Sequence, residues 1–231
     1  MIEVASLGEQ IERQLKQEIF SGRFKPGQQI PVQEFAAECG ISVTPVRDAL
    51  KRLDSAGFVR IAPRKGVYVA TPTAAAFREI SELRTALECL AVRSAATRIP
   101  ESELRHALTL LRKDRAHPKA AGKPADLREH DALVHDLIVA HCNNSRLQAV
   151  MRDLCDHLSW ARTIVVQRLK SPYRRSLPEH IEVLEALLAR DARMAERALR
   201  AHLERAARET LEALTTQEQQ ANGGPAQEPE A

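Results

Sequence analysis

The chain has 231 residues, of which 44% are hydrophobic and 3% are aromatic, and its formal net charge is +3. This length is sufficient for two domains with buried cores, and the abundance of Ala, Leu, Arg and Glu favours helices. The small net charge excludes a protein that coats polyanions with its whole surface, so contact with nucleic acid would require a local basic patch. The four cysteines lie far apart, and no stretch approaches the roughly 20 apolar residues that span a bilayer. We therefore expect a cytoplasmic protein without a membrane anchor.

The first predicted element is a helix over residues 7–20, in which apolar residues repeat every fourth position. A second apolar run ends at Gly40, where a sharp turn between two helices favours a residue that can adopt positive φ. Ser42 or Thr44 can cap the helix that follows. One face of that helix carries Val46, Ala49, Leu50 and Leu53, and the other carries Arg47, Lys51 and Arg52. The pattern predicts a helix-turn-helix of the kind that reads DNA, with a helical hairpin of purely structural role as the alternative.

Two short β-like runs follow over residues 58–69, on either side of a basic turn that contains proline and glycine. This pattern predicts a β-wing next to the helix-turn-helix. Between Gly40 and Ala70 the basic residues outnumber the acidic residues Asp48 and Asp54. They are Arg47, Lys51, Arg52, Arg60, Arg64 and Lys65. Positive charge concentrated beside a candidate recognition helix indicates contact with phosphates.

Eight short motifs of this region occur in an order that is similar to that of a known family. They are Ile11 to Gly22, Pro26-Gly27, Ile41-Ser42, Thr44-Pro45-Val46-Arg47, Ala49-Leu50, Leu53, Gly57-Phe58-Val59 and Arg64-Lys65-Gly66-Val67. In this order they resemble the winged helix of GntR-type bacterial transcription regulators over residues 7–71. The resemblance and the basic patch imply a set of DNA-contacting residues: Ser42, Thr44, Arg47, Arg52, Arg64, Lys65 and Gly66. Gln33 and Val43 stand where many members carry arginine, so we expect part of the base readout to differ.

Beyond the boundary at Thr71-Pro72-Thr73, the pattern is helical throughout. The predicted helices span about residues 73–98, 101–115, 126–142, 145–170, 175–190 and 191–214. The sequence thus predicts a mainly α protein: a winged helix-turn-helix over 1–71, an all-α six-helix bundle over 72–215 and a disordered tail over 216–231. Residues 117–124 form the one long polar loop.

Four residues of the helical part have the chemistry of metal ligands. Asp131 and His135 are four apart and share one helical face, while His180 and His202 each lie on an apolar stripe that points inward. Three imidazoles and a carboxylate suit a divalent metal ion such as Zn, Ni or Mn, with coordination positions left open. The alternative for each inward histidine is an ordinary hydrogen bond in the core.

The spacing of these four residues resembles the ligand set of the FCD domain, an all-helical effector domain that is fused to GntR winged helices in one branch of the family. The resemblance implies a metal that helps to hold a small carboxylate effector, and an arginine that supplies the opposing charge. We assign Arg84 to that role, because a guanidinium can bind a carboxylate through two parallel bonds. The alternative is a surface helix pair between Arg84 and Glu88.

The resulting prediction is a ligand-responsive transcription regulator, a repressor that forms a homodimer and binds an inverted repeat in double-stranded DNA. Two other functions fit part of the sequence. His130-Asp131 is also the dipeptide of helical metal-dependent hydrolases, but Asp131 belongs to the better-fitting set, and a general base and a phosphate-binding loop are missing. A helical scaffold with a basic head explains neither the wing nor the inward histidines, so we expect no enzyme.

Overall fold

The computed structural model describes residues 6–116, 131–166 and 172–222. The chain divides into two compact units, residues 1–72 and residues 73–231. Within the described residues it contains nine α-helices, one π-helical turn and a single two-stranded sheet, which confirms the mainly α fold class with a small β-wing. None of the described helices has an apolar stretch long enough to cross a bilayer.

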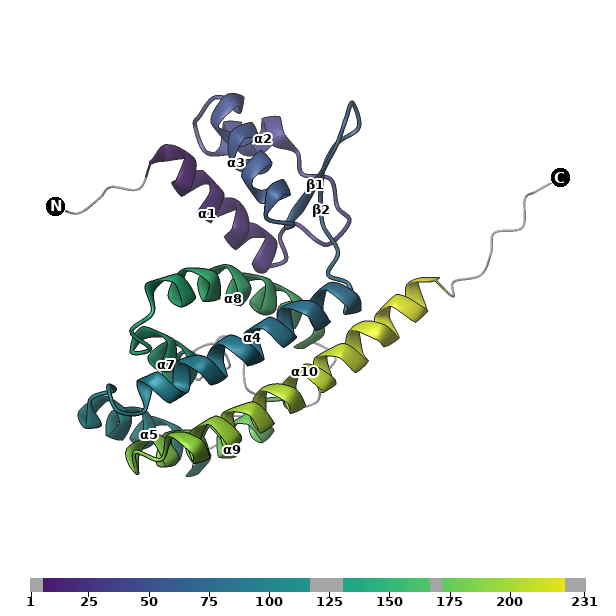
Figure 1. The fold of residues 1–231 in the computed structure, drawn as a ribbon. Coiled ribbons are helices and arrows are strands. Elements are labelled where there is room, and N and C mark those ends of the chain that lie inside the picture. Colours follow the sequence, from purple (N-terminus) through teal and green to yellow (C-terminus); the bar gives the residue numbers. More distant parts are fainter. Residues whose placement is uncertain (1–5, 117–130, 167–171, 223–231) are drawn as a thin grey trace. The chain divides into compact units, whose positions relative to one another are not determined.

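The first unit consists of three helices and a hairpin (Figure 1). The elements are α1 (Leu7–Phe20), α2 (Val32–Glu38), α3 (Val43–Ser55), β1 (Val59–Ala62) and β2 (Gly66–Val69). Ser6 and Glu9 form a capping box that begins α1, since each side chain bonds the backbone N–H of the other residue. The apolar stripes predicted for the first and third helices are buried against one another: Ile11, Leu15, Ile19, Val46, Ala49, Leu50 and Leu53.

The turn between α2 and α3 depends on Gly40, whose φ of 66° lies in the left-handed region that favours glycine. The wing pairs antiparallel, with Val59 opposite Val69 and Ala62 opposite Gly66. Gln29, which precedes α2, forms an isolated bridge with Tyr68 of β2. The hairpin is therefore attached to the body of the unit through both strands, because β1 packs on α3 and β2 pairs with Gln29.

The second unit is built around two long antiparallel helices, α4 (Ala74–Ala95) and α10 (Ala192–Asn222), which lie side by side in Figure 1. Thr73 caps α4 by accepting a hydrogen bond from Ala76 N. The other elements are α5 (Glu101–Ala116), a π-helical turn η1 (Ala132–Asp136), α7 (Leu137–Ala140), α8 (Ser145–Val166) and α9 (Pro172–Leu188). α8 packs on α4, while α9 packs on both α5 and α10, so their apolar faces enclose one core.

Two predictions need correction or fall outside the described residues. The predicted tail begins too early, because α10 continues to Asn222. Leu214 is buried against Ala74 and Phe77, and Glu218 accepts a hydrogen bond from Ala74 N, so contacts with α4 stabilise helical residues that the composition alone disfavours. The predicted loop over 117–124 and the start of the predicted helix over 126–142 lie outside the described residues.

Candidate functional site

The exposed face of α3 presents the residues that the sequence proposed for DNA contact. Ser42, Thr44 and Arg47 are all exposed. Ser42 is the N-cap residue of α3, but its side chain makes no capping hydrogen bond, so its hydroxyl is not committed to the helix end. Within the described residues the Arg47 side chain forms no ion pair and no hydrogen bond. A guanidinium in that state is available to a partner outside the chain.

Arg52, also proposed for DNA contact, has a role within the unit. Its Nε donates to Glu12 Oε2 at 2.7 Å, and its Nη2 donates to the Gly8 carbonyl at 2.8 Å. These bonds tie α3 to α1. The structure therefore gives Arg52 a bracing contact, and its DNA contact remains a prediction.

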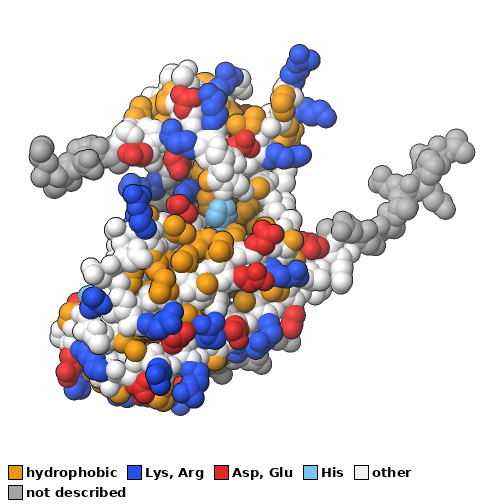
Figure 2. Space-filling view, in the orientation of Figure 1, with side chains coloured by type: hydrophobic (Ala, Val, Ile, Leu, Met, Phe, Trp, Pro, Cys, Tyr) orange, Lys and Arg blue, Asp and Glu red, His pale blue; other side chains and the backbone are white. Residues whose placement is uncertain are grey.

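The tip of the wing is basic and held in place. Arg64 and Lys65 are exposed, and Figure 2 shows Lys and Arg side chains gathered around this hairpin. The Lys65 carbonyl accepts hydrogen bonds from Gln29 Nε2 at 3.2 Å and from the Tyr68 hydroxyl at 3.1 Å. Gly66 has a φ of 123°, and a Cβ atom there would lie 2.4 Å from Gln29 Nε2. Only glycine fits this position without a shift of its neighbours.

In the second unit, the structure brings the three predicted histidines together. His135 of η1, His180 of α9 and His202 of α10 are each at most 3% exposed, and their candidate ligand atoms all lie within 4.8 Å of one another. The Nε2 atoms of His180 and His202 are 3.1 Å apart, and Asp131 Oδ1 is 3.7 Å from His180 Nε2. Three helical segments far apart in the sequence thus converge on one point.

Carboxylates hold the outer nitrogens of two of these imidazoles. His135 Nδ1 lies 2.5 Å from Glu88 Oε2, and His202 Nδ1 lies 2.7 Å from Glu179 Oε2. A ring that donates from Nδ1 keeps the lone pair of Nε2 for another partner. Burial lowers the pKa of His202 to about 4, so its ring is neutral at pH 7. His135 Nε2 is buried and has no hydrogen-bond partner among the described residues.

Arg84 and Glu88 do form a helix pair, but the pair lies in the core and not at the surface. Arg84 Nε donates to Glu88 Oε1 at 2.5 Å, and the two side chains are 7% and 0% exposed. Burial is the largest single effect and opposes both charges, but the attractions together outweigh it. Glu88 and Asp131 raise the pKa of Arg84, while Arg84 and His135 lower the pKa of Glu88 to about 2. Both groups are therefore charged at neutral pH.

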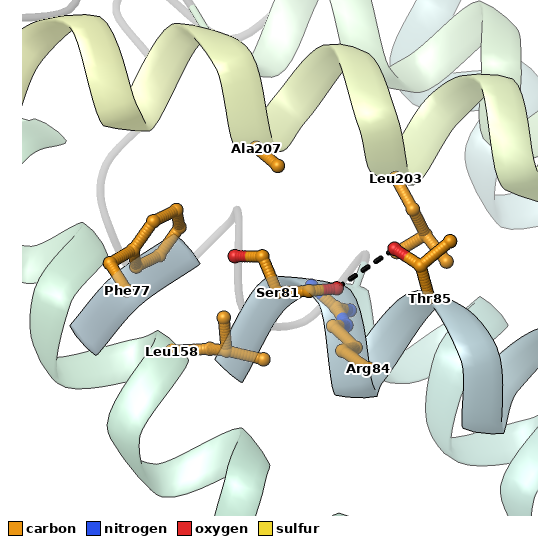
Figure 3. Close-up of a pocket in the computed structure, with 7 residues that line it drawn as sticks. All are labelled: Phe77, Ser81, Arg84, Thr85, Leu158, Leu203 and Ala207. Carbon is orange, nitrogen blue, oxygen red and sulfur yellow. Dashed lines mark hydrogen bonds between the residues drawn. The ribbon is translucent and has the colours of Figure 1, made fainter. Parts of the chain in front are cut away.

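A small cavity between α4, α8 and α10 opens beside Arg84 (Figure 3). It contains about 200 Å3 of empty space, part of it open to solvent, and is lined by Phe77, Ser81, Arg84, Thr85, Leu158, Leu203 and Ala207. Ser81 Oγ is buried and has no hydrogen-bond partner among the described residues. Arg84 Nη1 and Nη2 likewise form no hydrogen bond with any residue that the structure describes. The mostly apolar cavity thus offers one unbonded hydroxyl and the terminal nitrogens of a guanidinium that is already paired with Glu88.

Sequence reasoning missed two residues near the histidines, Glu179 and Arg205. Arg205 bonds both carboxylate oxygens of Glu179, which in turn contacts His202. Burial raises the pKa of Glu179, but the hydrogen bonds from His202 and Arg205 outweigh it and lower that pKa. Arg205 is three residues from His202 and so shares its helical face, but Glu179 lies on another helix, and nothing in the sequence pattern pairs them.

Comparisons with known proteins agree with this architecture. The profile of bacterial regulatory proteins of the gntR family matches residues 7–69, and the profile of the FCD domain matches residues 79–205. The Nta operon transcriptional regulator of Aminobacter aminovorans is 32% identical over 167 residues, which cover 72% of this chain and 77% of that protein. The HTH-type transcriptional repressor RspR of Escherichia coli (strain K12) is 28% identical over 198 residues, 86% of either chain. A crystal structure of a transcriptional regulator GntR from Rhodococcus sp. RHA1 shares the fold with a TM-score of 0.76 at 23% identity, over 90% of this chain and 99% of that one.

The winged helix-turn-helix and the helical domain that follows it in the sequence define a DNA-binding transcription regulator. The chain belongs to the gntR family of bacterial regulatory proteins, in the group whose members carry an FCD domain. Members of the family and the relatives named above are transcription regulators and not enzymes, so the hydrolase alternative is set aside. His130 of its characteristic dipeptide lies outside the described residues.

Proposed function

We propose that this protein is a repressor whose affinity for DNA is controlled by a small carboxylate that binds beside a divalent metal ion in the helical domain. The observation that carries the proposal is the convergence of His135, His180 and His202 in the core, with His135 Nε2 buried and unpartnered among the described residues. Such a nitrogen costs free energy unless a metal or a donor satisfies it. RspR, a relative, is named a repressor, which supports that direction of control.

The DNA contacts are proposed for α3 and the wing. α3 would lie in the major groove, where the Arg47 guanidinium suits bidentate contact with guanine, and Ser42 and Thr44 would contact DNA from its first turn. Lys65, Gly66 and Arg64 would meet the backbone from the wing tip, because basic side chains and free backbone N–H groups bind phosphate.

The metal would be held by the three histidines, whose candidate ligand atoms all lie within 4.8 Å of one another, together with Asp131, whose Oδ1 lies 3.7 Å from His180 Nε2. Zn, Ni and Mn all accept imidazole together with a carboxylate. When bound, the ion would supply a positive centre with coordination positions open to an anionic ligand. Glu88 and Glu179 would keep two of the rings oriented from outside.

The effector is proposed to be a small carboxylic acid. Arg84 and Ser81 offer donors in a cavity whose remaining wall is largely apolar, and a guanidinium with free terminal nitrogens matches the geometry of a carboxylate. The enclosed part of the cavity is about the size of one water molecule, so the side chains around Arg84 would have to move apart to admit the acid.

We propose a homodimer, which would act on DNA in the cytoplasm. Two copies related by a two-fold axis would present two α3 helices to an inverted repeat. The effector would favour an arrangement in which the two units no longer match the half-sites. The size of that shift is limited by the difference in effector affinity between the two arrangements.

The test is the selection of bound sites from random duplex DNA, repeated in the presence of a panel of small carboxylates. We expect enrichment of an inverted repeat and at least one acid that weakens binding to it. Ser81→Ala should bind the repeat normally but respond several-fold less to that acid, since one neutral hydrogen bond contributes about 1 kcal/mol. Thr109→Ala, which removes an exposed hydroxyl of α5 outside the cavity, is the matched control. A pool without sequence enrichment would refute the DNA-reading function.

A further inference from the structure

Two arrangements of the same kind converge on the histidine cluster. In the first, Arg84 bonds Glu88, and Glu88 contacts His135 Nδ1. In the second, Arg205 bonds Glu179, and Glu179 contacts His202 Nδ1. Each consists of an arginine, a glutamate and an imidazole, and in each the Nε2 atom is left to the cluster. The repetition points to a shared role for the glutamates.

The second arrangement is anchored more firmly than a single ion pair requires. The guanidinium of Arg205 faces Glu179 side on, with Nε and Nη2 each bonded to a different carboxylate oxygen. Its Nη1 bonds Glu209 at 2.9 Å, and Nη2 also reaches Ser176 Oγ at 3.3 Å. Because both oxygens of Glu179 are engaged, this carboxylate is poorly placed to become a metal ligand itself. It can instead fix the imidazole that it contacts.

We propose that Glu179 and Arg205 are positioning residues of the metal centre, an inference that rests on the proposed metal-binding function. A neutral imidazole carries one proton, either on Nδ1 or on Nε2. Glu179 holds the proton of His202 on Nδ1, which leaves the Nε2 lone pair directed at His180 Nε2, 3.1 Å away. Arg205 keeps the carboxylate in place by bonding both of its oxygens. Metal affinity therefore depends on two residues that do not touch the metal.

An interhelical ion pair with a purely structural role would not need the histidine. α9 and α10 already pack through buried Leu184, Leu187, Leu199 and Leu203, so their association does not rest on Glu179. α10 also carries a comparable ion pair, Arg200 with Glu196, that contacts no histidine. Arg200 thus provides a matched control on the same helix.

The first experiment measures the zinc dissociation constant of metal-stripped protein by competition with a chromophoric chelator. Glu179→Ala should weaken zinc binding by about 10- to 100-fold, the usual effect of removing a group that orients a metal ligand. Glu179→Gln should recover part of the loss, because its amide oxygen still accepts from His202 Nδ1. Arg205→Ala should weaken binding less than Glu179→Ala, and Arg200→Ala should leave it unchanged.

The second experiment reads the proton position directly. In metal-free protein labelled with 15N-histidine, long-range 1H–15N correlation spectra should show His202 protonated on Nδ1 in the wild type, and protonated on Nε2 or on a mixture of both sites in Glu179→Ala. A structural ion pair would not change this signature. If the wild type binds zinc but Glu179→Ala keeps its affinity and its proton on Nδ1, the positioning role is overturned. If the wild type binds no metal ion of the three proposed, the metal-binding function fails instead, and the spectra still test the contact with Glu179.

Discussion

The buried pair of Arg84 and Glu88 leads to a quantitative prediction for Arg84→Met. Methionine fills much of the same volume but leaves Glu88 as an uncompensated charge at 0% exposure. Removing one partner of a buried ion pair costs about 3 to 5 kcal/mol. Glu88 keeps its contact with His135, which places the expected cost towards the lower end of that range.

A second pair on the chain provides the comparison. Arg105 and Glu101 have the same spacing of four residues, but their side chains are 65% and 58% exposed. Since solvent screens such a pair, Arg105→Ala should change the free energy of unfolding by about 0.5 kcal/mol or less. The contrast between the two substitutions isolates the effect of burial.

The assay is urea unfolding followed by circular dichroism, with metal-stripped protein so that ligand binding does not contribute. Arg84→Met should lower the urea midpoint far more than Arg105→Ala, without a change in slope. The double variant Arg84→Met, Glu88→Gln should recover part of the loss, because a neutral amide still accepts from His135 without a buried charge. Equal, small effects of Arg84→Met and Arg105→Ala would show that the pair is accessible to water and that the charge argument is wrong.

Three further predictions concern the first unit. Arg47→Ala should weaken binding to a selected operator by about 1 to 3 kcal/mol in a fluorescence titration. Arg13→Ala, which removes the same charge from α1, should have much less effect. Equal losses in the two variants would count against base contact by α3. Lys65→Ala should reduce the slope of log affinity against log salt by about one unit, whereas an unchanged slope would remove Lys65 from the phosphate contacts. Gly66→Ala should destabilise the wing by roughly 1 to 3 kcal/mol, because a φ of 123° is strained for alanine and the new Cβ would meet Gln29. Normal DNA affinity and normal unfolding of this variant would contradict the described wing geometry.

The winged helix-turn-helix could be predicted from the sequence because its signals are local. The stripe of Val46, Ala49, Leu50 and Leu53 has helical spacing, and Gly40 occupies a turn that needs positive φ. These features arise from neighbouring residues, so a linear pattern contains them. The inward direction of His180 and His202 followed in the same way from apolar periodicity.

The partners of these side chains could not be predicted, because they lie on other helices. Nothing near Arg52 in the sequence indicates that it reaches Gly8 and Glu12, and nothing near His202 indicates Glu179. For the same reason, the sequence does not show whether an ion pair is buried or exposed. A spacing of four residues predicted contact between Arg84 and Glu88, but only the packing of neighbouring helices decides between core and surface.

At the end of α10, the sequence predicted disorder where the structure has a helix. Its Gln- and Glu-rich composition indicates disorder after Thr216, and in isolation such a segment buries too little apolar surface to fold. Glu218 nevertheless bonds Ala74 N at the start of α4, 144 residues away. A contact over this separation contributes nothing to local periodicity, so composition gave the wrong boundary.

The most direct test of the account is the metal content of the freshly purified protein, measured by elemental analysis for the wild type and for His180→Ala. We predict about one divalent ion of Zn, Ni or Mn per chain in the wild type, as expected for one cluster of imidazoles, and a large loss in the variant. A wild type without stoichiometric metal, or a variant that retains the full amount, would contradict the account.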